Sequence, residues 1–157
     1  MTRVPMTPEG FARLTEELAR IKMVEVPKNI KDIEEAREHG DLRENAEYHA
    51  AKDKQGHLAA RQNYLQDHLA RAEVIDPKTL KSDRVVFGAT VTLENDDTGE
   101  VTKVKIVGED EADPNRGMIN LASPMAKAMI GKSVDDEVKL KTSHVQKTFY
   151  VLKIEFV

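Results

Sequence analysis

A seven-residue repeat in the first half of the chain constrains the fold more than any other feature. Ala51, Leu58, Leu65 and Ala72 are spaced seven apart, and Leu69 marks a second apolar position of the same repeat. This spacing keeps one apolar seam facing a partner helix along its whole length. It predicts a helix from about residue 42 to residue 72 that packs lengthwise on another helix.

The partner helix is expected immediately upstream. Thr7 suits its N-cap and Pro8 its first position, where the missing N–H costs no hydrogen bond. Pro27 predicts a kink or a loosened turn rather than an end. Gly40 suits the left-handed residue that follows a helix. The apolar stripe of this helix comprises Phe11, Leu14, Leu18, Ile21, Ile30, Ile33 and Ala36.

Two such helices joined by a short turn form an antiparallel coiled-coil hairpin. With about 30 residues in each arm, the hairpin reaches ~45 Å. Its seam weakens towards the turn, where polar residues replace leucines.

The period of the sequence changes after residues 74–84, which predict a linker because Asp76-Pro77 breaks the helix. The residues NDDTG, 95–99, predict a hairpin turn between the first two of five strands. Alternation in the last strand predicts one buried face that carries Tyr150, Leu152, Ile154 and Phe156. The five strands are expected at 85–95, 100–108, 117–122, 136–142 and 147–157.

One helix interrupts the strands, with Ser123 as its N-cap, Pro124 at its first position and Gly131 as its stop. The predicted fold class is therefore α+β with two domains. Residues 1–76 form an antiparallel coiled-coil hairpin with an acidic tip near 38–45, and residues 77–157 form a small β-sheet domain with one helix.

Composition excludes several classes of function. The chain has no cysteine, so disulfides, zinc–thiolate sites and thiol catalysis are excluded. Its formal net charge of −4 disfavours nucleic-acid binding through phosphate contacts alone. Neither a signal peptide nor an apolar run of ~18 residues is present, so we expect a cytoplasmic protein without a membrane partner.

The turn EHGDLRENAEYH, residues 38–49, carries two carboxylates, Asp41 and Glu44, at a spacing of three. One interpretation is structural, because an acid at the N-cap followed three residues later by Glu resembles a capping box. The other is chemical, because two carboxylates can bind one Mg²⁺ ion, although a partner must supply its remaining ligands. The two interpretations can hold together.

Other residues near this turn also have two interpretations. Arg37, Arg43, Lys52 and Lys54 either pair with neighbouring acids, namely Glu34, Glu38, Glu47 and Asp53, or guide a phosphate chain towards Asp41 and Glu44. His39, His49 and Tyr48 are expected to pack or face solvent rather than to bind a metal or a base.

Five segments in their order along the chain resemble the Gre family of bacterial transcript-cleavage factors. They are EAREHGDLRENAEYHAAKDKQG, RAEVIDP, VVFGATVTL, IVGEDEAD and SPMAKAMIGK. The resemblance covers essentially the whole chain. It implies an N-terminal coiled coil and a C-terminal domain like that of the FK506-binding proteins.

The resemblance also implies a function. Such a factor acts as a monomer on backtracked bacterial RNA polymerase: its coiled coil enters the secondary channel, and its C-terminal domain docks at the rim. The polymerase then cleaves the nascent RNA near its extruded 3′ end, so the factor is not itself an enzyme. Asp41 and Glu44 match the essential tip acids, which help to hold a Mg²⁺ ion shared with the polymerase; the free protein is expected to hold none.

The remaining residues are carried over from the same resemblance. Asn45 supports the tip, Arg37 and Lys52 match the basic patch that contacts RNA, and Ser123 with Pro124 lies in the region that meets the polymerase rim. Position 43 is Arg here, whereas many relatives have Ser or Lys.

Three alternatives remain at this point. The first is a member of the same superfamily that occupies the channel and inhibits the polymerase without cleavage; the retained Asp41, Glu44 and Asn45 favour cleavage. The second is a prolyl isomerase or chaperone, which the few aromatic residues of the C-terminal half disfavour. The third is a purely structural coiled-coil adaptor.

Overall fold

The computed structural model describes residues 2–157 and has the expected two-domain α+β fold. Its contacts divide the chain into two compact units. One contains Phe11–Arg71, and the other contains Thr2–Gly10 together with Ala72–Val157. The predicted domain boundary between residues 76 and 77 stays a prediction.

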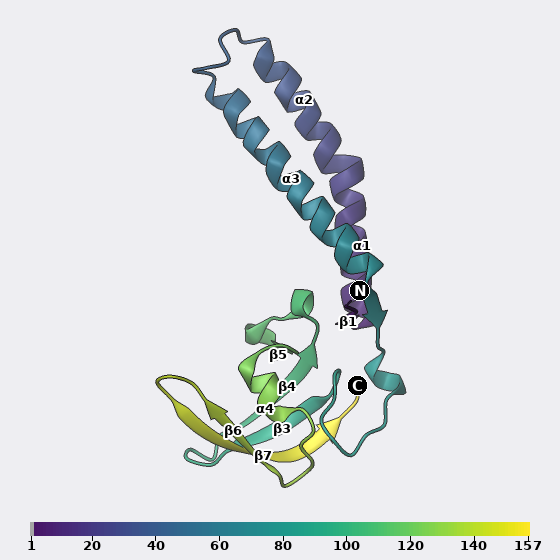
Figure 1. The fold of residues 1–157 in the computed structure, drawn as a ribbon, viewed down its shortest axis with the longest axis vertical. Coiled ribbons are helices and arrows are strands. Elements are labelled where there is room, and N and C mark those ends of the chain that lie inside the picture. Colours follow the sequence, from purple (N-terminus) through teal and green to yellow (C-terminus); the bar gives the residue numbers. More distant parts are fainter. Residues whose placement is uncertain (1) are drawn as a thin grey trace. The chain divides into compact units, whose positions relative to one another are not determined.

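The first unit is the predicted helical hairpin (Figure 1). Its first arm consists of α1, Pro8–Arg20, a π-helical turn, Ile21–Glu25, and α2, Val26–Arg37. Its second arm is α3, Ala46–Ala70, which lies antiparallel beside α2. The loosened turn expected near Pro27 is confirmed as the π-helical turn directly before α2.

The π-helical turn keeps the apolar seam in phase. Leu14 and Ile21 are buried seven residues apart, Ile21 and Asn29 eight apart, and Asn29 and Ala36 seven apart. A π-turn adds one residue to an α-helix, which accounts for the single step of eight. The prediction that Ile30 belongs to the stripe is therefore wrong, and Ile30 is 48% exposed.

Polar contacts complete the hairpin seam where leucines are absent. The buried Asn29 side chain donates through Nδ2 to the Ala51 carbonyl on the other arm, at 2.9 Å. Leu65, farther from the turn, is fully buried. Asn29 thus joins the two arms directly in the stretch where the sequence predicted a weaker seam.

The second unit contains a five-stranded sheet of order β5-β4-β3-β7-β6. Helix α4 contributes Ala126 and Met129 to the core that one face of this sheet forms, and Ser123 is confirmed as the helix N-cap. The five predicted strands are all present, and the predicted turn joins β3 to β4. Helix α4 spans Pro124–Met129. The strands are β3 Thr90–Asn95, β4 Val101–Val107, β5 Met118–Asn120, β6 Glu137–Lys141 and β7 Gln146–Glu155.

A bulge in β7 overturns the predicted alternation. Thr92 pairs with Lys153 and Leu93 pairs with Val151, so Leu152 has no partner on β3. One extra residue moves every following side chain to the opposite face. Val151 is consequently fully buried and Leu152 is 40% exposed, and the prediction that Tyr150, Leu152, Ile154 and Phe156 share one buried face is wrong.

A short parallel pair was not predicted. β1, Val4–Met6, pairs with β2, Ala72–Val74, so the first residues of the chain fold with the second unit. Helix α3 therefore ends at Ala70, and Ala72 lies in a strand rather than at the predicted helix end. In the same unit, the buried Glu111 carboxylate accepts hydrogen bonds from Thr7 N, at 3.0 Å, and from Gly108 N, at 3.1 Å.

Candidate functional site

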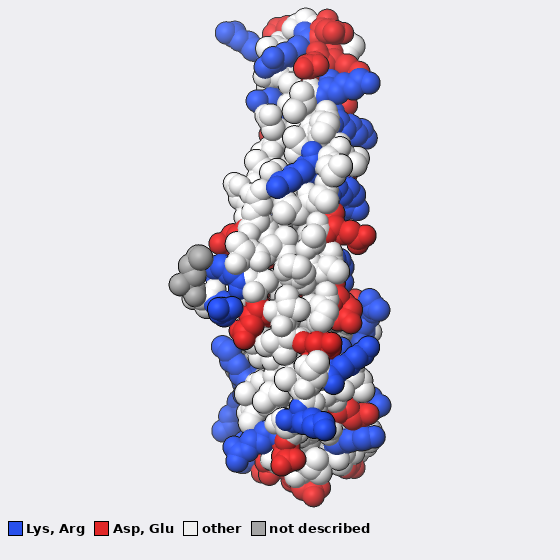
Figure 2. All heavy atoms as spheres, turned by 90° about the vertical axis from the view of Figure 1, so that its right-hand side faces the viewer, with Lys and Arg blue, Asp and Glu red and all other residues white. Residues whose placement is uncertain are grey.

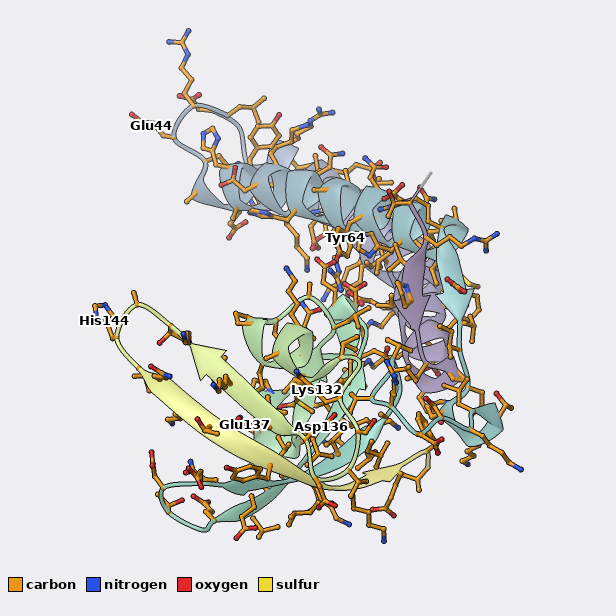
Figure 3. All side chains as sticks on the ribbon, turned by 60° about the horizontal axis from the view of Figure 1, so that its bottom comes forward. Glu44, Tyr64, Lys132, Asp136, Glu137 and His144 are labelled. Carbon is orange, nitrogen blue, oxygen red and sulfur yellow. The ribbon has the colours of Figure 1, made fainter. Side chains whose placement is uncertain are left out.

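The candidate site is the loop of residues 38–45 between α2 and α3, which we call the tip loop. Gly40, the third residue of this loop, has φ +102°, the left-handed conformation predicted for it. Figure 3 shows Glu44 at the end of the hairpin with its side chain directed away from both helices. Asp41 and Glu44 are both exposed, and both lie in non-helical backbone.

Asn45, rather than Asp41, is the N-cap of α3. Its Oδ1 accepts a hydrogen bond from Tyr48 N at 3.0 Å, and the helix begins at Ala46. The predicted start near residue 42 and the predicted capping box are therefore wrong. Asp41 instead closes a local turn, in which its Oδ1 accepts a hydrogen bond from Arg43 N at 2.9 Å.

Asn45 also joins the two arms at the tip. Its Nδ2 donates to the Ala36 carbonyl at 2.6 Å, near the end of α2. One side chain thus satisfies a free N–H at the start of α3, a group that helix ends leave without a partner. It also adds a hydrogen bond to a carbonyl in the last turn of α2 that already accepts from His39 N at 3.2 Å.

The two tip acids have no cationic partner within residues 2–157. Glu44 makes neither a hydrogen bond nor an ion pair in this range, and Asp41 is bonded only through the turn to Arg43 N. The same residues contain no cluster of three or more His, Asp or Glu side chains that would complete a metal site. The loop therefore offers two carboxylates and requires further ligands from outside the described chain.

Basic side chains surround the tip without neutralising its acids, and Figure 2 shows both signs of charge at this end of the hairpin. Lys54 pairs with Glu25 of the other arm at 3.6 Å, and Lys52 donates to Gln55 Oε1 at 2.8 Å. The Arg37 guanidinium lies 6.0 Å from the centre of the Tyr48 ring. None of these four basic residues, Arg37, Arg43, Lys52 and Lys54, pairs within the described range with the acids predicted for them, namely Glu34, Glu38, Glu47 and Asp53.

Both histidines of the tip contact the protein itself. His39 Nε2 lies 3.7 Å from Glu47 Oε2, and His49 Nε2 lies 3.0 Å from the Arg43 carbonyl oxygen. The Tyr48 and His49 rings meet edge-on with their centres 5.7 Å apart. Sequence reasoning assigned no function to His49, and its position one turn after a helix start was the only signal available.

Ser123 and Pro124 lie in the second unit, at the start of α4. Ser123 Oγ accepts a hydrogen bond from Ala126 N at 3.2 Å, and Pro124 occupies the first turn. These contacts give both residues a structural role, and their predicted contact with a polymerase stays a prediction.

Comparison with protein families decides the identity. The N-terminal family model of the GreA/GreB transcription elongation factors matches residues 4–74, and the C-terminal model of that family matches residues 80–156. The chain belongs to the GreA/GreB family. Its members, the Gre factors, stimulate transcript cleavage by RNA polymerase. The chain is accordingly a transcription elongation factor that interacts with RNA polymerase.

Individual Gre relatives match along the full length. Transcription elongation factor GreA of Sphingopyxis alaskensis is 52% identical, over 99% of this chain and 97% of that protein. Transcription elongation factor GreA of Anaeromyxobacter sp. is 50% identical, over 100% of this chain and 95% of that protein. Among solved structures, that of the transcription factor Gfh1 is 30% identical, covers 98% of this chain and 99% of its own, and has a TM-score of 0.47.

Within residues 2–157, no helix is both long enough and apolar enough to cross a membrane.

Proposed function

We propose that this chain inserts its helical hairpin into the secondary channel of bacterial RNA polymerase, where Asp41 and Glu44 promote cleavage of backtracked nascent RNA. The observation that carries the proposal is the exposure of these two acids and their lack of a cationic partner. Both are exposed in a loop at the end of a hairpin, and neither faces a neutralising cation within residues 2–157. Such groups are available to a partner's site.

The tip acids suit a Mg²⁺ ion that is shared with the polymerase. Mg²⁺ prefers six oxygen ligands and is commonly bound through one or two carboxylates together with water and substrate oxygens. Asp41 and Glu44 provide oxygen donors of this kind but too few to complete a site. When bound, a second Mg²⁺ in phosphodiester hydrolysis stabilises developing charge and activates a water molecule.

The residues of the chain hold and surround these acids. Asp41 uses Oδ1 in the turn with Arg43, which leaves Oδ2 for a ligand. Asn45 fixes the end of the tip loop to both arms. Arg37 and Lys52 are exposed on the two arms close to the tip and are proposed to contact the phosphates of the extruded RNA.

The C-terminal unit is proposed to dock at the rim of the channel through the region of Ser123 and Pro124. In this role the protein acts as a monomer in the cytoplasm. It is not itself an enzyme, because its two acids complete chemistry that belongs to the polymerase.

RNA cleavage in stalled, backtracked polymerase complexes tests the proposal. We expect Asp41→Ala and Glu44→Ala each to lower the cleavage rate by about 100-fold, as for loss of a group that holds or orients a metal. Binding to polymerase should be unchanged, because Asn45 rather than Asp41 caps α3. Asp53→Ala is the matched control, since it removes an exposed acid from α3 outside the tip loop.

Two results would contradict this function. Unchanged cleavage by both tip variants would remove the acids from the mechanism. Tight binding of the wild-type protein without cleavage, across a Mg²⁺ titration, would instead identify an inhibitory channel-binding factor.

A further inference from the structure

The backbone of Arg43 is held at both of its polar groups. Its N–H donates to Asp41 Oδ1 at 2.9 Å, and its carbonyl oxygen lies 3.0 Å from His49 Nε2. The Arg43 side chain is exposed and takes part in neither contact. Residue 43 thus links the two acids through its backbone, whichever side chain it carries.

The contact with His49 fixes the peptide group that leads to Glu44. The Arg43 carbonyl and the Glu44 N–H belong to one planar unit, so holding that oxygen restricts the rotation that would reorient the Glu44 Cα. Glu44 itself makes no hydrogen bond or ion pair within residues 2–157. Its direction therefore depends on the backbone on either side of it, namely Arg43 and the Asn45 cap.

His49 is itself held in place. It lies in the first turn of α3, where its N–H donates to the Asn45 carbonyl at 3.1 Å. Its ring meets the edge of Tyr48, and the Arg37 guanidinium lies over the Tyr48 ring. The His49 side chain thus reaches back from a rigid element to a loop that has no regular structure.

We propose that His49 is a positioning residue for the tip acids, acting through a hydrogen bond from Nε2–H to the Arg43 carbonyl. A carbonyl oxygen only accepts hydrogen bonds, so the contact requires a proton on Nε2. This inference rests on the proposed role of Asp41 and Glu44. It adds that the orientation of Glu44 is set in the free protein, before any partner binds.

The first test measures the tip of the free protein by NMR. His49→Leu replaces the imidazole with an apolar side chain and so removes the donor, and His49→Gln places an amide N–H at a similar reach. We expect the backbone order parameters of Arg43 and Glu44 to fall in His49→Leu and to recover in His49→Gln. His57→Leu, an exposed histidine on the same helix, is the matched control and should leave both amides unchanged. Equal order in His49→Leu and wild type would overturn the proposal.

The second test measures RNA cleavage with the same variants in backtracked complexes. We expect His49→Leu to bind polymerase with unchanged affinity, to lower the maximal cleavage rate about 10-fold and to raise the Mg²⁺ concentration needed for half-maximal rate. His49→Gln should recover most of the rate. A loosened loop with wild-type cleavage would overturn the positioning role. Absence of cleavage by the wild-type protein would refute the proposed function, and the order parameters would then decide whether His49 holds the loop.

Discussion

Among single residues of the hairpin, Asn45 makes the contacts with the widest effect. It caps α3 through Oδ1 and bonds the end of α2 through Nδ2, so one side chain defines where both arms stop. An exposed loop of eight residues would otherwise lose much of its order, because fixing each backbone residue costs roughly 1–2 kcal/mol of conformational entropy. The tip acids lie within the segment that these two bonds enclose.

Replacement of Asn45 should separate its two contributions. Asn45→Ala should lower the free energy of unfolding of the hairpin by about 1–2 kcal/mol, because it removes both the cap and the bond to Ala36. Asn45→Ser should recover the cap but not the bond to Ala36, since Ser caps well with a shorter side chain. Urea unfolding followed by helical circular dichroism measures both, and Asn63→Ala, exposed on α3, is the control. Equal stability of all four proteins would contradict this role.

At the scale of secondary-structure elements, the π-helical turn is the feature that matches the two arms. It absorbs one residue between Ile21 and Asn29, and the exposed side chains of Met23 and Val24 lie within it. The seam contains one step of eight residues instead of seven. In a regular α-helix this extra residue would rotate half of the first arm by about 100° away from its partner, and the π-helical turn prevents that rotation.

This geometry predicts which deletion the hairpin tolerates. Deletion of Val24 should convert the π-turn to α-helix and leave the seam in phase, with the melting temperature changed by only a few degrees. Deletion of Ala60, exposed in the regular helix α3, should rotate the preceding seam residues by about 100° and cause extensive loss of stability. Thermal melting compares the two, and a larger loss for the Val24 deletion would show that the π-turn does not act as a one-residue insertion.

The elements differ in how far the sequence could predict them. The hairpin follows from a seven-residue apolar repeat, which few other folds produce. The cap was predicted wrongly because Asp41 is a good N-cap residue, but Asn45, which is an equally good one, caps α3 and also contacts Ala36, nine residues away. The β7 bulge was not predictable, because Tyr150, Leu152, Ile154 and Phe156 form a convincing alternating pattern that only the pairing with β3 breaks.

In the candidate site, too, the residues that form a sequence pattern could be predicted, and a contact that leaves no pattern could not. Asp41 and Glu44 were found from their residue types and their position between two helices. The hydrogen bond between His49 and the Arg43 carbonyl was not found, because a side chain that bonds a backbone carbonyl leaves no characteristic spacing in a sequence.

At the scale of the whole molecule, the first residues of the chain fold with the C-terminal half. Thr2–Gly10 belongs to the second unit, and the buried Glu111 carboxylate accepts hydrogen bonds from Thr7 N, Thr7 Oγ1 and Gly108 N. Two glycines make this approach feasible. A Cβ at Gly10 would lie 2.3 Å from the Glu111 side chain, and one at Gly108 would lie 2.4 Å from the Pro5 carbonyl oxygen.

Glu111→Gln should destabilise the second unit by about 1–3 kcal/mol, because an amide cannot accept all three hydrogen bonds and one buried donor is left unpaired. Glu109→Gln, exposed two residues away, is the control and should change the free energy of unfolding by no more than about 0.5 kcal/mol. Chemical denaturation monitored through the C-terminal tyrosine and phenylalanine signals measures both. Equal stability of the two variants would argue against Glu111 as the anchor of the N-terminal segment.

The two hydrogen bonds of the Asn45 side chain limit how the sequence of this protein can vary. Because the Asn45 side chain bonds both Ala36 at the end of α2 and Tyr48 in α3, the number of residues between the two arms is fixed. Exchanges at exposed positions of this segment, such as Arg43, leave both hydrogen bonds intact. An inserted or deleted residue does not, because Asn45 would no longer reach both arms. Evolution and protein engineering are therefore free to change the chemistry of this tip, but only within a constant number of residues.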